Sequence, residues 1–110
     1  MAVTKRVLGQ NAPSATTLTD LYTVGSGKQT TVSSIVVCNR SATATSFRIA
    51  VAPAGEADAV KHYSYYDTAI PGNDTLIATL GKTLAATDKI RVYATLATLS
   101  FQVFGAEEDI

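Results

Sequence analysis

The side chains best suited to nucleophilic or acid–base chemistry are one histidine and one cysteine, His62 and Cys38. A histidine can act as a general base near neutral pH, and a thiol can serve as its nucleophile. Cys38, however, ends the apolar run 32–38, which predicts a covered strand, and buried thiols are usually inert. We therefore predict no Cys–His catalytic pair, and a lone histidine cannot form a multi-histidine metal site.

Two segments resemble parts of a phosphate-binding loop, namely 25–28 (Gly-Ser-Gly-Lys) and 81–83 (Gly-Lys-Thr). That loop needs a glycine five residues before its Gly-Lys pair, and a Ser or Thr after the lysine. Tyr22 and Leu76 stand where the first glycines would be, and Gln29 follows the first lysine. Both segments are therefore predicted to be β-turns.

The nine carboxylates fall mostly at expected turns or near the C-terminus, and they form no Asp-x-Asp-x-Asp ladder for calcium. Their spacing leaves a glycosidase-type carboxylate pair open, but a chain this short without tryptophan is poorly equipped for a sugar cleft. We predict that the protein is not an enzyme and has no cofactor or metal. The carboxylates are Asp20, Glu56, Asp58, Asp67, Asp74, Asp88, Glu107, Glu108 and Asp109.

The composition argues for a surface that is covered by a partner. Charged residues make up 16% of the 110 residues, below the roughly 25% of an average domain, and the formal net charge is zero. A neutral chain lacks the basic footprint of a nucleic-acid binder and the polybasic patch of a membrane-surface protein. No secretion signal and no membrane-spanning apolar stretch are visible. We therefore expect no nucleic acid and no membrane among the partners.

Hydrophobic residues alternate with polar ones at period two, as in 47–51, 90–94 and 99–103, which is typical of half-buried strands. Turn residues separate these runs at roughly ten-residue spacing. The chain is predicted to be all-β, a single antiparallel β-sandwich or jelly roll of about eight strands over 1–110. The expected strands are 4–9, 17–24, 29–39, 45–52, 60–67, 75–80, 89–95 and 98–104, with a short helical turn allowed at 58–61.

The segment 62–66 (His-Tyr-Ser-Tyr-Tyr) carries three of the five tyrosines. A regular strand would place Tyr63 and Tyr65 on one face and His62, Ser64 and Tyr66 on the other. Tyrosine combines apolar area with a hydroxyl group and is enriched at protein interfaces. We expect one face in the core and the other at a protein contact, and we take Tyr63, Tyr65, Tyr66 and His62 as candidate contact residues.

The two ends of the chain are charged in opposite senses. Lys5 and Arg6 lie in the segment 1–10, which could dock on a neighbouring protein as an arm, and both are candidate contact residues. The segment 106–110 is expected to be a solvated acidic tail. Exposed strand edges are expected to offer sites where a partner could add a strand.

Four phrases of the sequence, taken in order, resemble a family of short proteins encoded among tailed-bacteriophage structural genes. They are 12–24 (Ala-Pro-Ser-Ala-Thr-Thr-Leu-Thr-Asp-Leu-Tyr-Thr-Val), 32–40 (Val-Ser-Ser-Ile-Val-Val-Cys-Asn-Arg), 47–55 (Phe-Arg-Ile-Ala-Val-Ala-Pro-Ala-Gly) and 100–107 (Ser-Phe-Gln-Val-Phe-Gly-Ala-Glu). The segment 25–27 (Gly-Ser-Gly) departs from the Pro-Ala-Gly that relatives often carry, which should loosen that turn slightly.

The resemblance implies a virion structural protein that assembles in the bacterial host cytoplasm. Its most specific form is a head decoration (cement) protein, a homo-oligomer (trimer or dimer) that binds the major capsid protein or other virion proteins. A small tail, baseplate or connector component is the first alternative. A carbohydrate-binding module that uses Tyr63, Tyr65 or Tyr66 is an alternative of another class, and fold alone does not separate the three.

Overall fold

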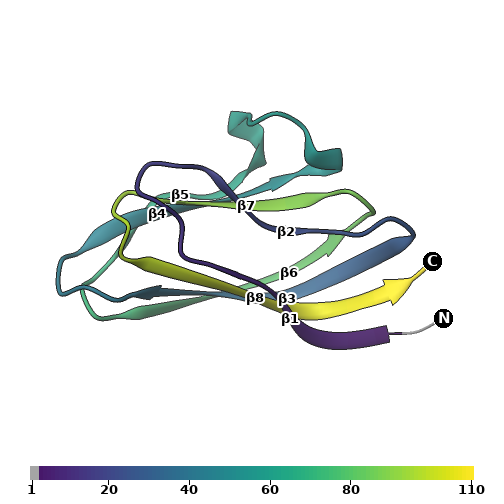
Figure 1. The fold of residues 1–110 in the computed structure, drawn as a ribbon, viewed down its shortest axis with the longest axis horizontal. Coiled ribbons are helices and arrows are strands. Elements are labelled where there is room, and N and C mark those ends of the chain that lie inside the picture. The colour runs from purple at the N-terminus through teal and green to yellow at the C-terminus, as the bar shows by residue number, and fades with distance from the viewer. Residues whose placement is uncertain (1–2) are drawn as a thin grey trace.

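The computed structural model describes residues 3–110, except the side chain of residue 80. Two four-stranded antiparallel sheets pack face to face (Figure 1). The elements are β1 (Val3–Asn11), β2 (Thr19–Thr23), β3 (Lys28–Asn39), β4 (Thr45–Ala52), η1 (Pro53–Gly55), η2 (Val60–His62), β5 (Tyr63–Ile70), β6 (Thr75–Leu84), β7 (Lys89–Ala94) and β8 (Leu99–Asp109). The described part of the chain has no helix long and apolar enough to cross a membrane.

Sheet A has the strand order β1-β8-β3-β6, and sheet B has the order β2-β7-β4-β5. The chain therefore passes from one sheet to the other at every connection except the β4–β5 connection, which stays in sheet B. Eight antiparallel strands in these two orders form a jelly roll. The predicted fold class, a single antiparallel sandwich or jelly roll of about eight strands, is confirmed.

The core lies between the sheets and is filled by the alternating side chains that the period-two pattern indicated. Phe47 and Ile49 of β4 face Phe101 and Val103 of β8, and all four are fully buried. The rings of Phe47 and Phe101 meet edge to face with their centroids 6.2 Å apart, a favourable arrangement for aromatic pairs. This core holds the two sheets at a fixed separation, so each sheet presents one outer face.

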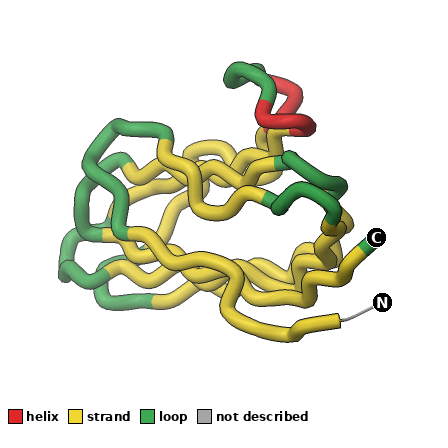
Figure 2. Tube along the Cα trace, turned by 45° about the vertical axis from the view of Figure 1, so that its right-hand side comes forward, coloured by secondary structure: helices red, strands yellow, loops and turns green. Residues whose placement is uncertain are grey.

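The predicted strand 60–67 begins three residues later than expected. Residues 60–62 form the 3₁₀ turn η2, in which the His62 amide donates to the Ala59 carbonyl, and β5 runs on to Ile70. The helical turn expected at 58–61 overlaps this element. Figure 2 shows the segment 53–62, which contains both short turns, standing out beyond the strands on the side of sheet B.

Residues 3–10 do not project as the docking arm that was expected of 1–10, and residues 106–109 are not the solvated acidic tail that was expected of 106–110. Within 1–10, residues 1 and 2 lie outside the described part, and β1 pairs along its length with β8 of the same chain. Within 106–110, residues 106–109 belong to β8, which pairs with β1 and β3. Backbone pairing on both sides makes β8 a central strand, and the charged ends become sheet rather than tails.

All four edge strands contain an extra residue relative to the strand they pair with. The extra residues are Leu8 in β1, Leu21 in β2, Ser64 and one of 66–67 in β5, and one of 80–81 in β6. Such β-bulges twist an edge and interrupt its row of hydrogen-bonding groups, which protects the edge from pairing with another chain. The edges are therefore poorer sites for strand addition than the sequence suggested.

Candidate protein-contact site

A compact group of aromatic and charged side chains lies on the outer face of sheet B. We call Arg48, Tyr63, Tyr66, Asp67 and Tyr93 the tyrosine–arginine cluster. The Arg48 guanidinium lies 4.1 Å from the ring centroid of Tyr66 and 4.3 Å from that of Tyr93. Tyr63 and Tyr66 meet edge to face with centroids 5.0 Å apart. Strands β4, β5 and β7 therefore contribute to one surface.

The bulges in β5 bring Tyr63 and Tyr66 to the same face. A regular strand would put residues that are three apart on opposite faces. Ser64, however, is an extra residue between the pairs Tyr63–Ala50 and Tyr65–Ile49, so Tyr63 and Tyr65 lie on opposite faces and Tyr66 shares the face of Tyr63. Tyr65 instead points inward, where its ring lies 5.9 Å from that of Phe47. The prediction that one face of the segment 62–66 joins the core is confirmed. The prediction that Tyr63 and Tyr65 share a face is wrong.

Arg48 is held in place by an ion pair as well as by the two rings. Its Nε donates to Asp67 Oδ1 at 2.7 Å, and its Nη2 donates to Asp67 Oδ2 at 3.3 Å. The hydrogen bond to Asp67 raises the pKa of Arg48 above its already high ordinary value. Tyr66, in contrast, remains 56% exposed. The cluster is therefore a rigid group with an exposed aromatic side chain.

The segment 53–62 is held beside this cluster by contacts to β7 and to Asp88, the residue before it. Arg91 donates from Nη1 to the Glu56 carbonyl at 2.7 Å and from Nη2 to the Gly55 carbonyl at 3.2 Å. Asp88 accepts the Ala54 amide at 2.8 Å. Asp20 forms ion pairs with Lys89 and Arg91 of β7. The hydrogen bond from Lys89 is the main cause that lowers the pKa of Asp20.

His62 anchors the end of this segment rather than presenting a surface. Its side chain is 3% exposed, and its Nε2 lies 3.2 Å from Glu56 Oε1. The expectation that His62 contacts a partner is wrong in this geometry, because the 3₁₀ turn directs its ring inward. Tyr63, the next residue, hydrogen-bonds Asp58, and burial followed by this hydrogen bond raises the pKa of Tyr63.

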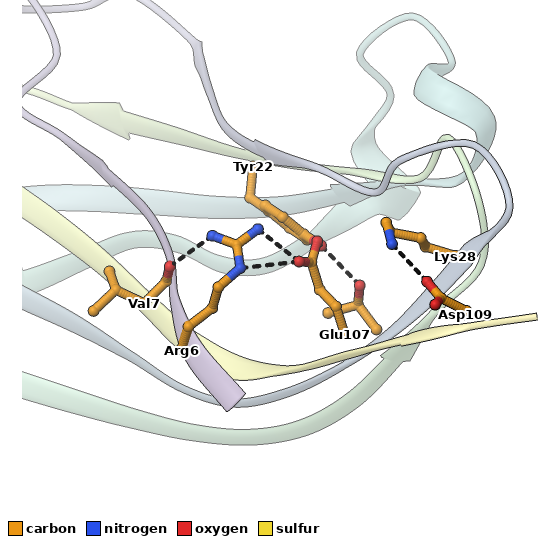
Figure 3. Close-up of polar contacts among 7 residues, drawn as sticks. Arg6, Val7, Tyr22, Lys28, Glu107 and Asp109 are labelled. Carbon is orange, nitrogen blue, oxygen red and sulfur yellow. Dashed lines mark hydrogen bonds and ion pairs between the residues drawn. The ribbon is translucent and has the colours of Figure 1, made fainter. Parts of the chain in front are cut away.

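A second polar group joins the two sheets (Figure 3), at the end where both termini lie (Figure 1). Tyr22 of sheet B donates to Glu107 Oε2 of sheet A at 2.5 Å, and its hydroxyl also lies 2.8 Å from Thr30 Oγ1. Arg6 donates twice to Glu107 Oε1, at 3.0 Å from Nε and 2.6 Å from Nη2. Lys28 and Asp109 form a neighbouring ion pair at 2.6 Å.

This Tyr22–Glu107–Arg6 group shifts the pKa values of Glu107 and Tyr22 in opposite directions. The hydrogen bond from Tyr22, followed by the interaction with Arg6, holds the pKa of Glu107 below its usual value. Burial and the hydrogen bond to Glu107 raise the pKa of Tyr22 to about 12. Arg6, predicted as a contact residue, is therefore committed to its own chain, and its role is to join β1 to β8.

The predicted candidates thus divide among separate parts of the fold. Tyr63 and Tyr66 lie in the tyrosine–arginine cluster, whereas Lys5 is exposed on the outer face of sheet A. Sequence reasoning did not single out Arg48 and Tyr93 as site residues. The alternating pattern placed both on the polar side of their strands, but only the β4–β7 register, which pairs Arg48 with Tyr93, brings them together.

Within residues 3–110, no group of three or more His, Cys, Asp or Glu side chains is arranged to hold a metal ion. Comparison with protein-family models, curated proteins and solved structures found no match for this chain. The resemblance to tailed-phage structural proteins therefore stays a prediction drawn from the sequence.

Proposed function

We propose that this chain is a structural protein of a tailed-bacteriophage particle, and that it decorates the head by binding capsid subunits through the tyrosine–arginine cluster. The resemblance of its sequence phrases supports the particle assignment. The observation that carries the contact surface is Arg48 held between Tyr66 and Tyr93 on an outer sheet face. The proposal involves no catalysis and no cofactor.

The chemistry of the cluster suits a protein partner. Tyrosine and arginine are enriched among the few residues that carry most of the binding energy of protein interfaces. The ion pair to Asp67 and the stacked rings hold these side chains before binding, so little conformational entropy is lost when a partner covers them. Tyr66, which is 56% exposed, has the most surface to lose.

The two alternative functions differ from this proposal in ways that can be measured. A tail, baseplate or connector component would occur in few copies and away from the head. A carbohydrate-binding module would need open aromatic rings on which a sugar can stack. Arg48 covers part of the Tyr66 and Tyr93 rings, which favours a protein partner over a sugar.

The Tyr66→Ala variant tests the contact surface. We expect it to bind heads that lack the protein at least about 30-fold more weakly, as for an interface residue that contributes about 2 kcal/mol or more. Binding is measured by co-sedimentation of purified protein with heads from a phage in which this gene is deleted. The unfolding of the variant, followed by circular dichroism, should match that of the unchanged protein, so that the loss of binding can be assigned to the contact surface.

The matched control is Ile77→Ala, which truncates another exposed side chain on the outer face of the other sheet. We expect it to bind heads as the unchanged protein does. If Tyr66→Ala bound heads as tightly as Ile77→Ala, the tyrosine–arginine cluster would not be the contact surface.

A further inference from the structure

The outer face of sheet A differs in chemistry from the outer face of sheet B. Directly paired residues share a face, so the register of the strands shows which side chains lie together. Among the described residues of this face, the charged side chains are Lys5 and Glu108. The rows across the sheet are Val3–Glu108–Gln29, Lys5–Ala106–Thr31–Thr83, Val7–Phe104–Ser34–Thr79, Gln10–Gln102–Val36–Ile77 and Ser100–Cys38–Thr75.

Exposed apolar side chains and opposite charges come together at the β1–β8 end of this face. Val3 and Val7, which lie on the outer face away from the core, are 55% and 42% exposed. A shallow groove of about 540 Å³ is lined in part by Lys5, Val7, Phe104 and Ala106. We call Val3, Lys5, Val7, Phe104, Ala106 and Glu108 the β1–β8 patch.

We propose that the β1–β8 patch binds the same patch of a second copy of this chain, forming a dimer with a twofold axis that runs between β1 and β8. A twofold interface brings one surface against itself, so the surface must complement itself. With this axis, β1 of each copy lies over β8 of the other. Val7 then meets the groove at Phe104, because the two residues are paired within each sheet.

The charges of the patch satisfy the same symmetry. Lys5 pairs with Ala106, two residues from Glu108, so Lys5 of one copy lies over the Ala106–Glu108 stretch of the other. Each dimer then contains two equivalent Lys5–Glu108 contacts between copies. A patch with one positive and one negative side chain attracts itself across a twofold axis, whereas a patch with two like charges would repel itself.

The fold favours this face over the sheet edges for self-association. The edge strand β1 carries the bulge at Leu8 and the adjacent positive charges Lys5 and Arg6, and both a bulge and charged side chains hinder strand addition at an edge. Two strands from each copy bury less area than a standard interface, so the dimer forms and separates with concentration. Many copies on one particle would compensate for this weakness by multivalency.

Charge reversal on the purified full-length chain tests the proposal independently of any particle. We expect a concentration-dependent dimer for the unchanged protein in sedimentation equilibrium. Lys5→Glu and Glu108→Lys each place two like charges in the patch, and each should weaken the dimer at least about tenfold. Mixing the two variants restores both attractive contacts, so the mixture should form a heterodimer even though each variant alone is monomeric.

The mixture distinguishes contacts between copies from contacts within one chain, because an internal Lys5–Glu108 interaction cannot join two different variants. Lys61→Glu, a charge reversal on the exposed η2 turn, is the matched control and should dimerise normally. A monomeric or trimeric unchanged protein would overturn the proposal. So would single variants that dimerise normally, or a mixture that stays monomeric.

Discussion

The Phe47→Ala variant is expected to lose about 3–5 kcal/mol of unfolding free energy, the range for removal of a fully buried phenylalanine side chain. Phe47 is 0% exposed, and its ring contacts Phe101 of the opposite sheet and Tyr65 of the neighbouring strand. Its removal leaves a cavity that a two-sheet core cannot easily close, because β4 is a central strand. Urea unfolding followed by circular dichroism measures the loss.

The control for this variant is Ile77→Ala, which truncates a side chain that is 65% exposed. We expect its unfolding free energy to change by about 0.5 kcal/mol or less, as for a surface substitution. A loss of less than about 1 kcal/mol for Phe47→Ala would mean that Phe47 is not in the centre of the core, and the packing of the two sheets would have to be revised.

The Glu107→Gln variant is expected to lose about 1.5–3 kcal/mol of unfolding free energy at neutral pH, the range for a hydrogen bond to a charged group. Glu107 accepts from Tyr22 of the other sheet and from Arg6 of β1, and its side chain is 12% exposed. An amide cannot replace both interactions, since it lacks the negative charge that Arg6 requires. Urea unfolding at pH 7 measures the loss.

Acid weakens the same group. Because the folded state holds the pKa of Glu107 below its usual value of about 4.5, the carboxylate stabilises the fold above that pH. This stability is lost as the pH falls from about 4.5 through the lowered pKa of the folded state. We expect the unfolding free energy of the unchanged protein to fall in this range, and Glu107→Gln to show a smaller fall.

Glu108→Gln is the matched control, because Glu108 follows Glu107 in β8 but lies on the outer face, where it accepts from Gln29. Its acid profile should follow that of the unchanged protein. If the acid profiles of Glu107→Gln and the unchanged protein coincided, Glu107 would not join the two sheets.

At high pH, the unfolding free energy is expected to fall as Tyr22 ionises between about pH 10 and its raised pKa of about 12.

Most of the fold follows from local patterns. The expected strands 29–39 and 45–52 agree with β3 and β4 to within one residue, because alternating β-branched and aromatic residues are bounded there by turn residues. The ends of β6 and β8 extend past the expected 80 and 104. Their extra residues include glycines and acidic residues, which local propensity disfavours and which pairing with neighbouring strands holds in the sheet.

The candidate site was only partly predictable, since it depends on contacts between residues distant in sequence. Tyr63 and Tyr66 were predicted from composition, but their shared face requires the bulges of β5, which leave no clear signal in the sequence. Arg48 and Tyr93 are far apart along the chain and meet only through the β4–β7 register. The same holds for Tyr22 and Glu107, which belong to different sheets.

Counting the copies of this protein in purified particles and in tailless heads, by quantitative mass spectrometry, tests the proposal that it decorates a phage head. We expect tailless heads to carry the protein in a number comparable to that of their capsid subunits. Its absence from tailless heads, or a few copies confined to tails, would contradict the head assignment.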